Sequence, residues 1–369
     1  MRQNPQYKSI AVYPGNEESS GRRARYIETA RSFGMNEVFT TLHLPEQSFD
    51  RQVEDVLGIS RISRQFNMDL TVDIGGDCIR RILSDADALR RLKDARIQFL
   101  RLDYGNAQED IVKLAALLPV RGFVMNASTC TAEEAAAEAA FLKSLRPDME
   151  LRACHNYYVR PETGLDVSFA AHQKKIFDDL QIPVYFCVPG HQHPRGPLFT
   201  GLPTMESHRQ KNLELVLLDL IVNWQAQGLL LADEYFGEEE LAAVSRICAG
   251  LPVPVTVRID AEASAEEKKI ILGRHHFRYD SNGCVLRSQS SREMAEFASQ
   301  VTPHHCTSRP RGAVTVDNRD YLRYSGEMQV VESSLEADPK VNVAGYVDEI
   351  NMEKLSYFRG GYDYEFTEE

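Results

Sequence analysis

The segment IQFLRLDYG at residues 97–105, followed directly by NAQEDIVKLAALL at residues 106–118, is the clearest guide to the architecture of this chain. The first run is short and mostly apolar, which is typical of a strand that is buried on both faces of a sheet. The second run has apolar residues at the spacing of an amphipathic helix. A buried strand followed at once by a helix is the repeating unit of parallel α/β folds, so we predict a parallel sheet covered by helices.

The same unit repeats along the first two-thirds of the chain. Eight such units in roughly 240 residues match a closed (β/α)8 barrel, the TIM barrel. A doubly wound open sheet is the alternative, but it usually has a glycine-rich turn after its first strand, and no GxGxxG motif follows the first run, SIAVYPG. We therefore predict a TIM barrel over residues 1–250. Its predicted strands are residues 9–15, 36–46, 69–76, 97–105, 122–129, 151–161, 182–190 and 228–236.

After residue 250 the pattern changes. Short strand candidates follow one another closely, among them VPVTVRID (253–260), GAVTVDN (312–318) and VNVAGYV (341–347), and helical periodicity is sparse. Closely spaced short strands are typical of antiparallel β structure. We therefore predict a small, mainly antiparallel β domain over residues 251–369.

The charge and the cysteines exclude several functions. There are 42 Lys and Arg residues against 54 Asp and Glu, a net charge of −12, which disfavours binding to nucleic acid or to an anionic membrane. The seven cysteines are scattered without a CxxC pair, so neither a zinc site nor a disulfide framework is predicted. His191 and His193 form an HxH pair, but metal-dependent barrel hydrolases carry that pair on the first strand. We therefore expect neither a metal nor another cofactor.

The sequence also bears on location. The N-terminal segment MRQNPQYKSIAVYPG lacks the apolar run of a signal peptide. The most apolar helical run, residues 213–224, contains two acidic residues and is too short to span a bilayer. We therefore expect a cytoplasmic protein.

Polar side chains gather at the carboxyl ends of the predicted barrel strands, where barrel enzymes hold their active sites. Polar groups at the ends of buried strands must find partners or face solvent, so a ring of them predicts a polar catalytic cavity. Each residue also has a structural alternative, as a helix cap or as a buried, hydrogen-bonded group. The ring consists of His43, Asp73, Asp103, Asn126, His155, Asn156 and Asp233.

Two loops add positive charge to this end of the barrel. Arg160 follows the sixth predicted strand, and Arg195, His208 and Arg209 follow the seventh. Barrels often bind phosphate near their last loops, and the planar fork of arginine suits phosphate oxygens. We therefore expect an anionic, phosphorylated substrate; the alternative is solvated charge that is paired with neighbouring acids.

Five long motifs are unusual enough to be specific: RLDYG (101–105), NAST (126–129), CHNYYVRPETGL (154–165), RGPLFTGLPTMESHR (195–209) and RGAVTVDNRDYLRYSGEMQVV (311–331). Together they resemble the bacterial 6-phospho-N-acetylmuramidase family, in order and over nearly the whole chain. The resemblance implies a TIM barrel followed by a cyclophilin-like β-barrel domain. It also implies intracellular hydrolysis of N-acetylmuramic acid 6-phosphate–N-acetylglucosamine, a disaccharide of cell-wall recycling.

Glycoside hydrolysis usually needs two carboxyl groups, one as the acid and one as the base or nucleophile. We predict that Asp103 is the core catalytic carboxylate, with Asp73 or Glu206 as its partner and Asp233 as a further candidate. Retention, inversion and substrate-assisted attack by the acetamido group all remain open. In the barrel, the residues expected to contact the substrate are His43, Asn126, His155, Asn156, Tyr158, Arg160, Glu162, Arg195, His208 and Arg209.

The C-terminal domain is expected to contribute to the substrate site as well. Residues 309–327 form a dense polar cluster, from which we single out Arg311, Asp317, Asn318 and Tyr324 as substrate contacts. The alternative is a solvated hairpin face.

Two other classes of function remain open. One is another phosphosugar enzyme built on a TIM barrel: a 6-phosphoglycosidase of different specificity, an isomerase or an aldolase. A Schiff-base aldolase needs a lysine at a strand end, and none of the eight runs supplies one. The other class is a non-catalytic binding protein. The partner that the sequence favours is a small phosphorylated amino-sugar disaccharide.

Overall fold

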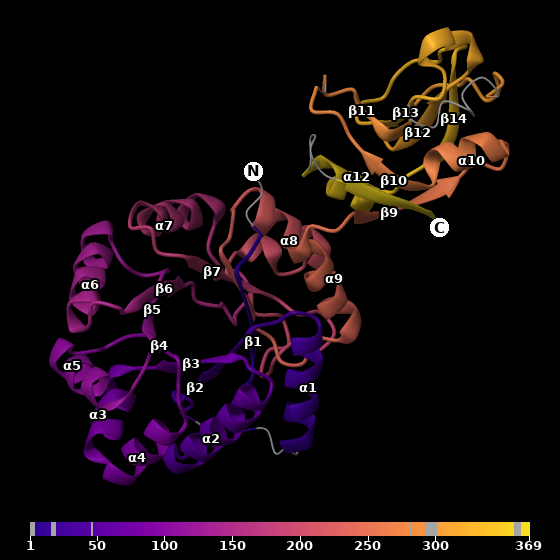
Figure 1. Cartoon of the computed structure of the whole chain (residues 1–369). Helices are drawn as coiled ribbons and strands as arrows, with labels where there is room; N and C mark the ends of the chain where they lie inside the picture. Colours follow the sequence, from indigo (N-terminus) through magenta and orange to yellow (C-terminus); the bar gives the residue numbers. More distant parts are fainter. Residues whose placement is uncertain (1–3, 16–19, 46, 281, 292–300, 358–362) are drawn as a thin grey trace. The chain divides into compact units, whose positions relative to one another are not determined.

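The computed structural model describes residues 4–15, 20–45, 47–280, 282–291, 301–357 and 363–369 (Figure 1). The chain divides into two compact units, Met1–Ser245 and Arg246–Glu369. In the described part of the chain, no helix combines the length and the hydropathy needed to cross a membrane.

The first unit is a closed barrel of eight parallel strands with helices around its outside (Figure 1). Neighbouring strands pair in chain order, and the last strand pairs back with the first from Tyr7–Gly228 to Ile10–Leu231. All eight predicted strands are present, so the predicted TIM barrel is confirmed. The strands are β1 (Tyr7–Ala11), β2 (Glu37–Thr41), β3 (Asp69–Ile74), β4 (Phe99–Leu102), β5 (Gly122–Asn126), β6 (Glu150–Cys154), β7 (Val184–Val188) and β8 (Gly228–Leu231).

The helical segment after β3 departs from the sequence pattern. Apolar spacing over residues 77–95 predicts one helix, whereas the structure has two. The second begins because Asp85 leaves the helical backbone conformation and its carboxylate accepts the N–H groups of Asp87 and Ala88, both at 3.0 Å. The helices are α1 (Ser20–Ser32), α2 (Phe49–Gln65), α3 (Gly76–Ser84), α4 (Ala86–Asp94), α5 (Gln108–Leu117), α6 (Ala132–Leu145), α7 (Val167–Asp179), α8 (Leu213–Val222) and α9 (Glu238–Ala249).

A buried polar group fills the barrel interior toward the amino ends of the strands. Glu37 and Arg152 form an ion pair there, and the Tyr185 hydroxyl lies 2.8 Å from each of them. Gly228 makes room for this group, because a Cβ at that position would lie 2.5 Å from the Tyr185 ring. These polar groups satisfy one another inside the barrel, away from the carboxyl ends of the strands.

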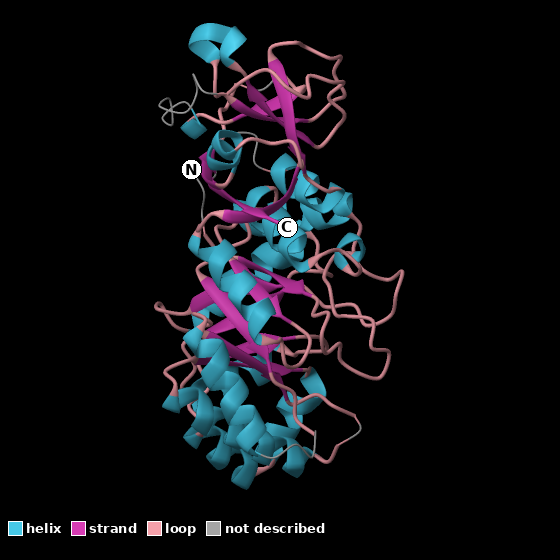
Figure 2. Cartoon of the chain, turned by 90° about the vertical axis from the view of Figure 1, so that its right-hand side faces the viewer, coloured by secondary structure: helices cyan, strands magenta, loops and turns pink. Residues whose placement is uncertain are grey.

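The second unit is built on a seven-stranded sheet in the order β10-β15-β9-β14-β12-β13-β11. Figure 2 draws the strands of both units in magenta. All neighbouring pairs are antiparallel except β15 and β9, so the prediction of a small, mainly antiparallel domain is confirmed. A bridge between Phe277 and Ser288 joins residues next to the two edge strands and curls the sheet toward a barrel; the cyclophilin-like topology stays a prediction. The elements are β9 (Val253–Ile259), α10 (Ala265–Ile271), β10 (Gly273–His276), β11 (Val285–Arg287), β12 (Ala313–Asp317), η3 (Arg319–Tyr324), β13 (Met328–Val331), β14 (Val341–Tyr346), α12 (Glu349–Ser356) and β15 (Asp363–Glu368).

Candidate active site

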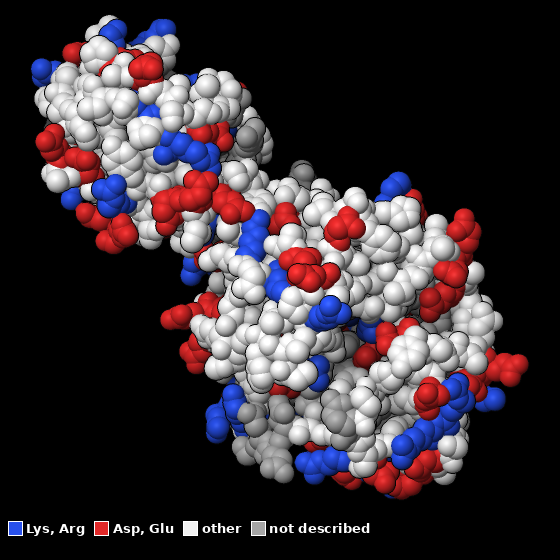
Figure 3. All heavy atoms as spheres, turned by 180° about the vertical axis from the view of Figure 1, so that it is seen from behind, with Lys and Arg blue, Asp and Glu red and all other residues white. Residues whose placement is uncertain are grey.

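A cavity of about 240 Å³ opens at the carboxyl ends of the barrel strands; we call it the inner cavity. It is the size of one sugar ring and smaller than a disaccharide. Seen from the side shown in Figure 3, the barrel unit is hollowed near its centre, where acidic and basic side chains lie next to each other. The polar residues that line the inner cavity are Thr41, His43, Asp73, Arg101, Asp103, His155, Asn156, Tyr157 and Tyr158.

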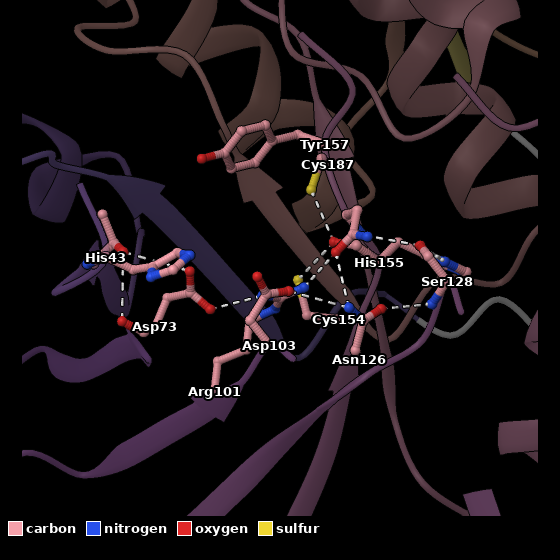
Figure 4. Close-up of polar contacts among 12 residues, drawn as sticks. His43, Asp73, Arg101, Asp103, Asn126, Ser128, Cys154, His155, Tyr157 and Cys187 are labelled. Atoms are coloured by element: carbon pink, nitrogen blue, oxygen red, sulfur yellow. Dashed lines mark hydrogen bonds and ion pairs between the residues drawn. The ribbon is translucent and has the colours of Figure 1, made fainter. Parts of the chain in front are cut away.

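Arg101 connects the two carboxylates of this cavity (Figure 4). It lies on β4, and its Nη1 donates to Asp73 Oδ1 at 2.6 Å and to Asp103 Oδ1 at 3.3 Å. Its Nη2 donates to Asn156 Oδ1 at 2.6 Å. The sequence prediction missed Arg101, although a charged residue within an otherwise apolar strand was a signal that could have revealed it. The guanidinium holds Asp73 and Asp103 side by side.

The amide side chains of Asn126 and Asn156 determine which atoms of this network remain free to bind a substrate. Asn126 Nδ2 donates to Asp103 Oδ1 at 3.2 Å and to Asn156 Oδ1 at 3.1 Å, while its own Oδ1 accepts the backbone N–H of Ser128 at 2.9 Å. Asp103 Oδ1 and Asn156 Oδ1 therefore each accept two hydrogen bonds within the network. Among the described residues, neither Asp103 Oδ2 nor Asn156 Nδ2 has a hydrogen-bond partner, which leaves one acceptor and one donor for a substrate.

Ser128 and His155 support this arrangement from behind. Ser128 Oγ accepts the backbone N–H of Asn156 at 2.9 Å and lies 3.1 Å from His155 Nδ1. Burial lowers the pKa of His155 to about 3, so its imidazole is neutral and Nδ1 can accept the Ser128 proton. His155 thus holds Ser128, which in turn holds Asn156. Ser128 is a second residue that the sequence prediction missed.

The environment of Asp73 favours its protonated form. Burial raises the pKa of Asp73 most strongly, the neighbouring Asp103 carboxylate raises it further, and Arg101 opposes both effects. The Asp73 side chain is 13% exposed and that of Asp103 is 22% exposed. A carboxyl group with a raised pKa beside a second, more exposed carboxyl group is an arrangement suited to acid–base catalysis.

Glu206 and Arg209 lie outside the inner cavity, and their hydrogen bonds link the loop after β7 to the loop after β6. Arg209 Nε and Nη2 donate to the two Glu206 oxygens at 2.7 and 2.8 Å, and Arg209 Nη1 donates to the carbonyl of Tyr158 at 2.9 Å. The Glu206 carboxylate also accepts the backbone N–H groups of Glu162 and Gly164. These bonds, with Arg209 the strongest influence, lower the pKa of Glu206 to about 2. The structure therefore brings Asp73, and not Glu206, beside Asp103.

Other predicted site residues also lie in loop contacts. Asp233 accepts three backbone N–H groups, from Gly190 at 2.8 Å, Arg195 at 2.7 Å and Leu202 at 2.9 Å. His208 Nε2 lies 2.8 Å from Asp219 Oδ2. The side chains of Arg160 and Glu162 are exposed on the loop after β6. Arg195 is closer to the inner cavity, because its Nη1 donates at 3.4 Å to the hydroxyl of Tyr157, which lines that cavity.

The histidine pair after β7, His191 and His193, is not part of a larger group of metal-ligating side chains among the described residues. Within the part of the chain that the structure describes, no group of three or more His, Cys, Asp and Glu side chains could hold a metal ion. Both His191 and His193 are exposed.

The four residues singled out in the C-terminal unit are also placed by the structure. Arg311 forms an exposed ion pair with Glu349 at 2.9 Å. Asn318 donates to Asn342 Oδ1 at 2.9 Å, and the Tyr324 hydroxyl accepts from Arg323 at 2.9 Å. Asp317 is buried at the end of β12. The roles of Arg311, Asp317, Asn318 and Tyr324 in binding substrate stay a prediction.

Asp317 makes the stability of the second unit sensitive to pH. Burial, followed by the carboxylates of Glu327 and Asp338, raises its pKa from 3.8 to about 7. The folded state therefore holds a proton that the unfolded state has lost, and stability should fall as pH rises from about 4 to about 7. We expect Asp317→Asn to remove this loss, so that the variant melts several degrees higher than the parent at pH 8 and gains little at pH 4. Thermal melting across this range measures the effect.

The exposed Asp320→Asn is the matched control for that experiment and should follow the parent at every pH. A constant offset between Asp317→Asn and the parent at all pH values would contradict the prediction.

A closed (β/α)8 barrel that holds two carboxyl groups side by side in a cavity at the carboxyl ends of its strands has the parts that a glycosidase needs. The comparison with known families agrees: residues 9–246 match the model for "6-phospho-N-acetylmuramidase, N-terminal" and residues 253–367 match "6-phospho-N-acetylmuramidase, C-terminal". The chain belongs to the 6-phospho-N-acetylmuramidase family, and the resemblance inferred from the motifs is confirmed.

Two solved structures are similar over almost the whole chain. One is a conserved protein of unknown function from Enterococcus faecalis, 29% identical, with a TM-score of 0.78 over 98% of this chain and 96% of that chain. The other is an uncharacterized B. cereus protein, 22% identical, with a TM-score of 0.76 over 98% of this chain and 99% of that chain; its similarity supports the fold. A search among curated proteins finds no match.

Proposed function

We propose that the protein hydrolyses N-acetylmuramic acid 6-phosphate–N-acetylglucosamine during cell-wall recycling. The observation that carries the proposal is the pair Asp73 and Asp103, held by Arg101 in a cavity that fits one sugar ring. Membership of the 6-phospho-N-acetylmuramidase family supports this choice of reaction and of substrate.

The two carboxyl groups would divide the chemistry between them. Asp73, whose pKa is raised, would protonate the oxygen of the leaving sugar as the general acid. Asp103 would act through Oδ2, either as the nucleophile or by orienting the acetamido group of the substrate for its own attack. Asn156 Nδ2 would donate to a sugar oxygen, and His43 and Tyr158 line the same cavity.

The geometry of the pair supports retention of the anomeric configuration. Asp73 Oδ1 and Asp103 Oδ1 contact the same Arg101 nitrogen at 2.6 and 3.3 Å. The two oxygens are therefore less than about 6 Å apart, whereas inverting enzymes hold their carboxyl groups roughly 6.5–9.5 Å apart to admit a water molecule. Both remaining mechanisms, a covalent intermediate and substrate-assisted attack, retain the configuration.

The proposal also includes a location. A phosphate monoester keeps a sugar on one side of a membrane, because a doubly charged group does not cross the hydrocarbon core unaided. The phosphorylated disaccharide and the enzyme would therefore meet in the cytoplasm.

The direct test offers the protein the phosphorylated disaccharide and the same disaccharide without phosphate. We expect the phosphorylated form to be cleaved with a kcat/KM roughly ten- to a hundredfold higher than that of the form without phosphate, with no added metal or nucleotide and no effect of a chelator. Mass spectrometry identifies the products, and proton NMR of the fresh reaction identifies the first anomer released, which should be β. Equal turnover of both disaccharides would contradict the proposed specificity, and an initial α product would contradict retention.

A further inference from the structure

A second cavity, of about 690 Å³, lies beside the inner one; we call it the outer cavity. Its lining includes Tyr13, His193, Arg195 and Glu234, and it shares Leu44 with the inner cavity. The rings of Tyr13 and Tyr157, one lining each cavity, meet edge to face with their centroids 6.2 Å apart. The two cavities are therefore neighbours at the carboxyl end of the barrel, separated by these tyrosine side chains.

Arg195 is held firmly at the boundary between the cavities. Its guanidinium carbon lies 3.5 Å from the centroid of the Tyr13 ring, and Nη1 donates to the Tyr157 hydroxyl at 3.4 Å. Its backbone N–H donates to Asp233 Oδ1 at 2.7 Å, and the Tyr13 hydroxyl donates to the carbonyl of Ala232 at 2.9 Å. The guanidinium, the ring below it and the backbone are thus each anchored to the frame of the barrel.

Arg195, which is half-buried, differs from the buried arginines of the barrel in its partners. An arginine that is partly withdrawn from solvent gains from a nearby opposite charge. Among the described residues, no ion pair within 4.0 Å joins Arg195 to a carboxylate; its side-chain contacts are with tyrosines. By contrast, each of four buried arginines contacts a carboxylate: Arg23 with Asp55, Arg101 with Asp73, Arg152 with Glu37 and Arg209 with Glu206.

The inner cavity is unsuited to an anion. The only guanidinium that lines it, that of Arg101, already donates to three oxygens, of Asp73, Asp103 and Asn156. An anionic group on the substrate would therefore find no free guanidinium there, whereas Arg195 lines the adjoining space. Glu234 faces the same outer cavity, so an anion should lie on the Arg195 side of it.

We propose that Arg195 binds the anionic group of the substrate in the outer cavity while the reacting sugar ring occupies the inner cavity. This inference rests on the proposed function. A sugar of the muramic type carries two anions, the 6-phosphate and the carboxylate of the lactyl ether. The planar fork of Arg195 can bind an oxyanion of either kind through two parallel hydrogen bonds.

The test compares Arg195→Gln with the parent on three substrates: the phosphorylated disaccharide, the same disaccharide without phosphate, and a phosphorylated chitobiose that lacks the lactyl group. On the phosphorylated disaccharide, the variant should lose about ten- to a hundredfold in kcat/KM. The loss should vanish on the substrate that lacks the anion bound by Arg195. That is the unphosphorylated disaccharide if the anion is phosphate, and the chitobiose if it is the lactyl carboxylate.

The exposed Arg90→Gln is the matched control for loss of one positive charge and should behave as the parent on all three substrates. An equal loss for Arg195→Gln on all three, or no loss on any, would overturn the inference. Calorimetric binding of N-acetylmuramic acid 6-phosphate separates this result from the proposed function, because it needs no turnover. Binding should weaken about ten- to a hundredfold in Arg195→Gln, and equal affinities would also overturn the inference.

Discussion

Replacing Asp103 by Asn is expected to lower kcat by about 10²–10⁴-fold while leaving the fold intact. The amide has nearly the shape of the carboxylate, and its oxygen can still accept from Arg101 and Asn126, as Asp103 Oδ1 does. The other position, which is free for the substrate, would then carry an NH2 group that can act neither as a base nor as a nucleophile. Steady-state kinetics on the phosphorylated disaccharide measures the loss.

Asp77→Asn is the matched control for that variant. Asp77 is an exposed aspartate on α3, with a side chain that is 89% exposed, so its replacement should change kcat by less than a factor of two. If Asp103→Asn kept more than about a tenth of the parent kcat, a barrier change below about 1.4 kcal/mol, Asp103 would be structural.

Replacing Asp73 by Asn should lower kcat by a similar factor, and it should also change how kcat depends on pH. A general acid must be protonated, so kcat of the parent should fall as pH rises through the raised pKa of Asp73. In Asp73→Asn this fall should be absent, because no proton remains to be lost at that position. We expect kcat of Asp73→Asn on the phosphorylated disaccharide to be about 10²–10⁴-fold lower than that of the parent.

A substrate with an activated leaving group separates the roles of the two carboxyl groups. A 4-nitrophenyl glycoside of N-acetylmuramic acid 6-phosphate needs little protonation of its leaving oxygen. On this substrate Asp73→Asn should recover most of its kcat, whereas Asp103→Asn should stay slow. Recovery by Asp103→Asn instead would reverse the assignment of acid and base.

The fold was readable from the sequence because of how a barrel strand is buried. The strands are buried on both faces over most of their length, so they form short runs rich in apolar residues that turn residues interrupt, as in residues 122–126. The carboxyl ends of parallel strands meet at one end of the barrel, so the sequence alone is enough to group Asp73, Asp103, Asn126 and Asn156.

The remainder of the site depends on contacts between loops, which spacing does not reveal. Glu206 and Asp233 have the residue type of catalytic acids, but backbone N–H groups from distant segments surround their carboxylates. Arg101 was missed for the opposite reason. It lies inside a strand, where burial is the ordinary expectation, and only the three-dimensional network makes it the link between two carboxylates.

The three backbone bonds of Asp233 have an evolutionary consequence. One carboxylate anchors the loop after β7 at Gly190, Arg195 and Leu202, so the stretches between those anchors are free to change in sequence without loosening the loop. The two carboxyl groups proposed to perform the reaction lie instead on β3, for Asp73, and directly after β4, for Asp103. Descendants of this barrel can therefore acquire new substrate preferences by exchanging a few loop residues, while they inherit the same bond-breaking machinery unaltered.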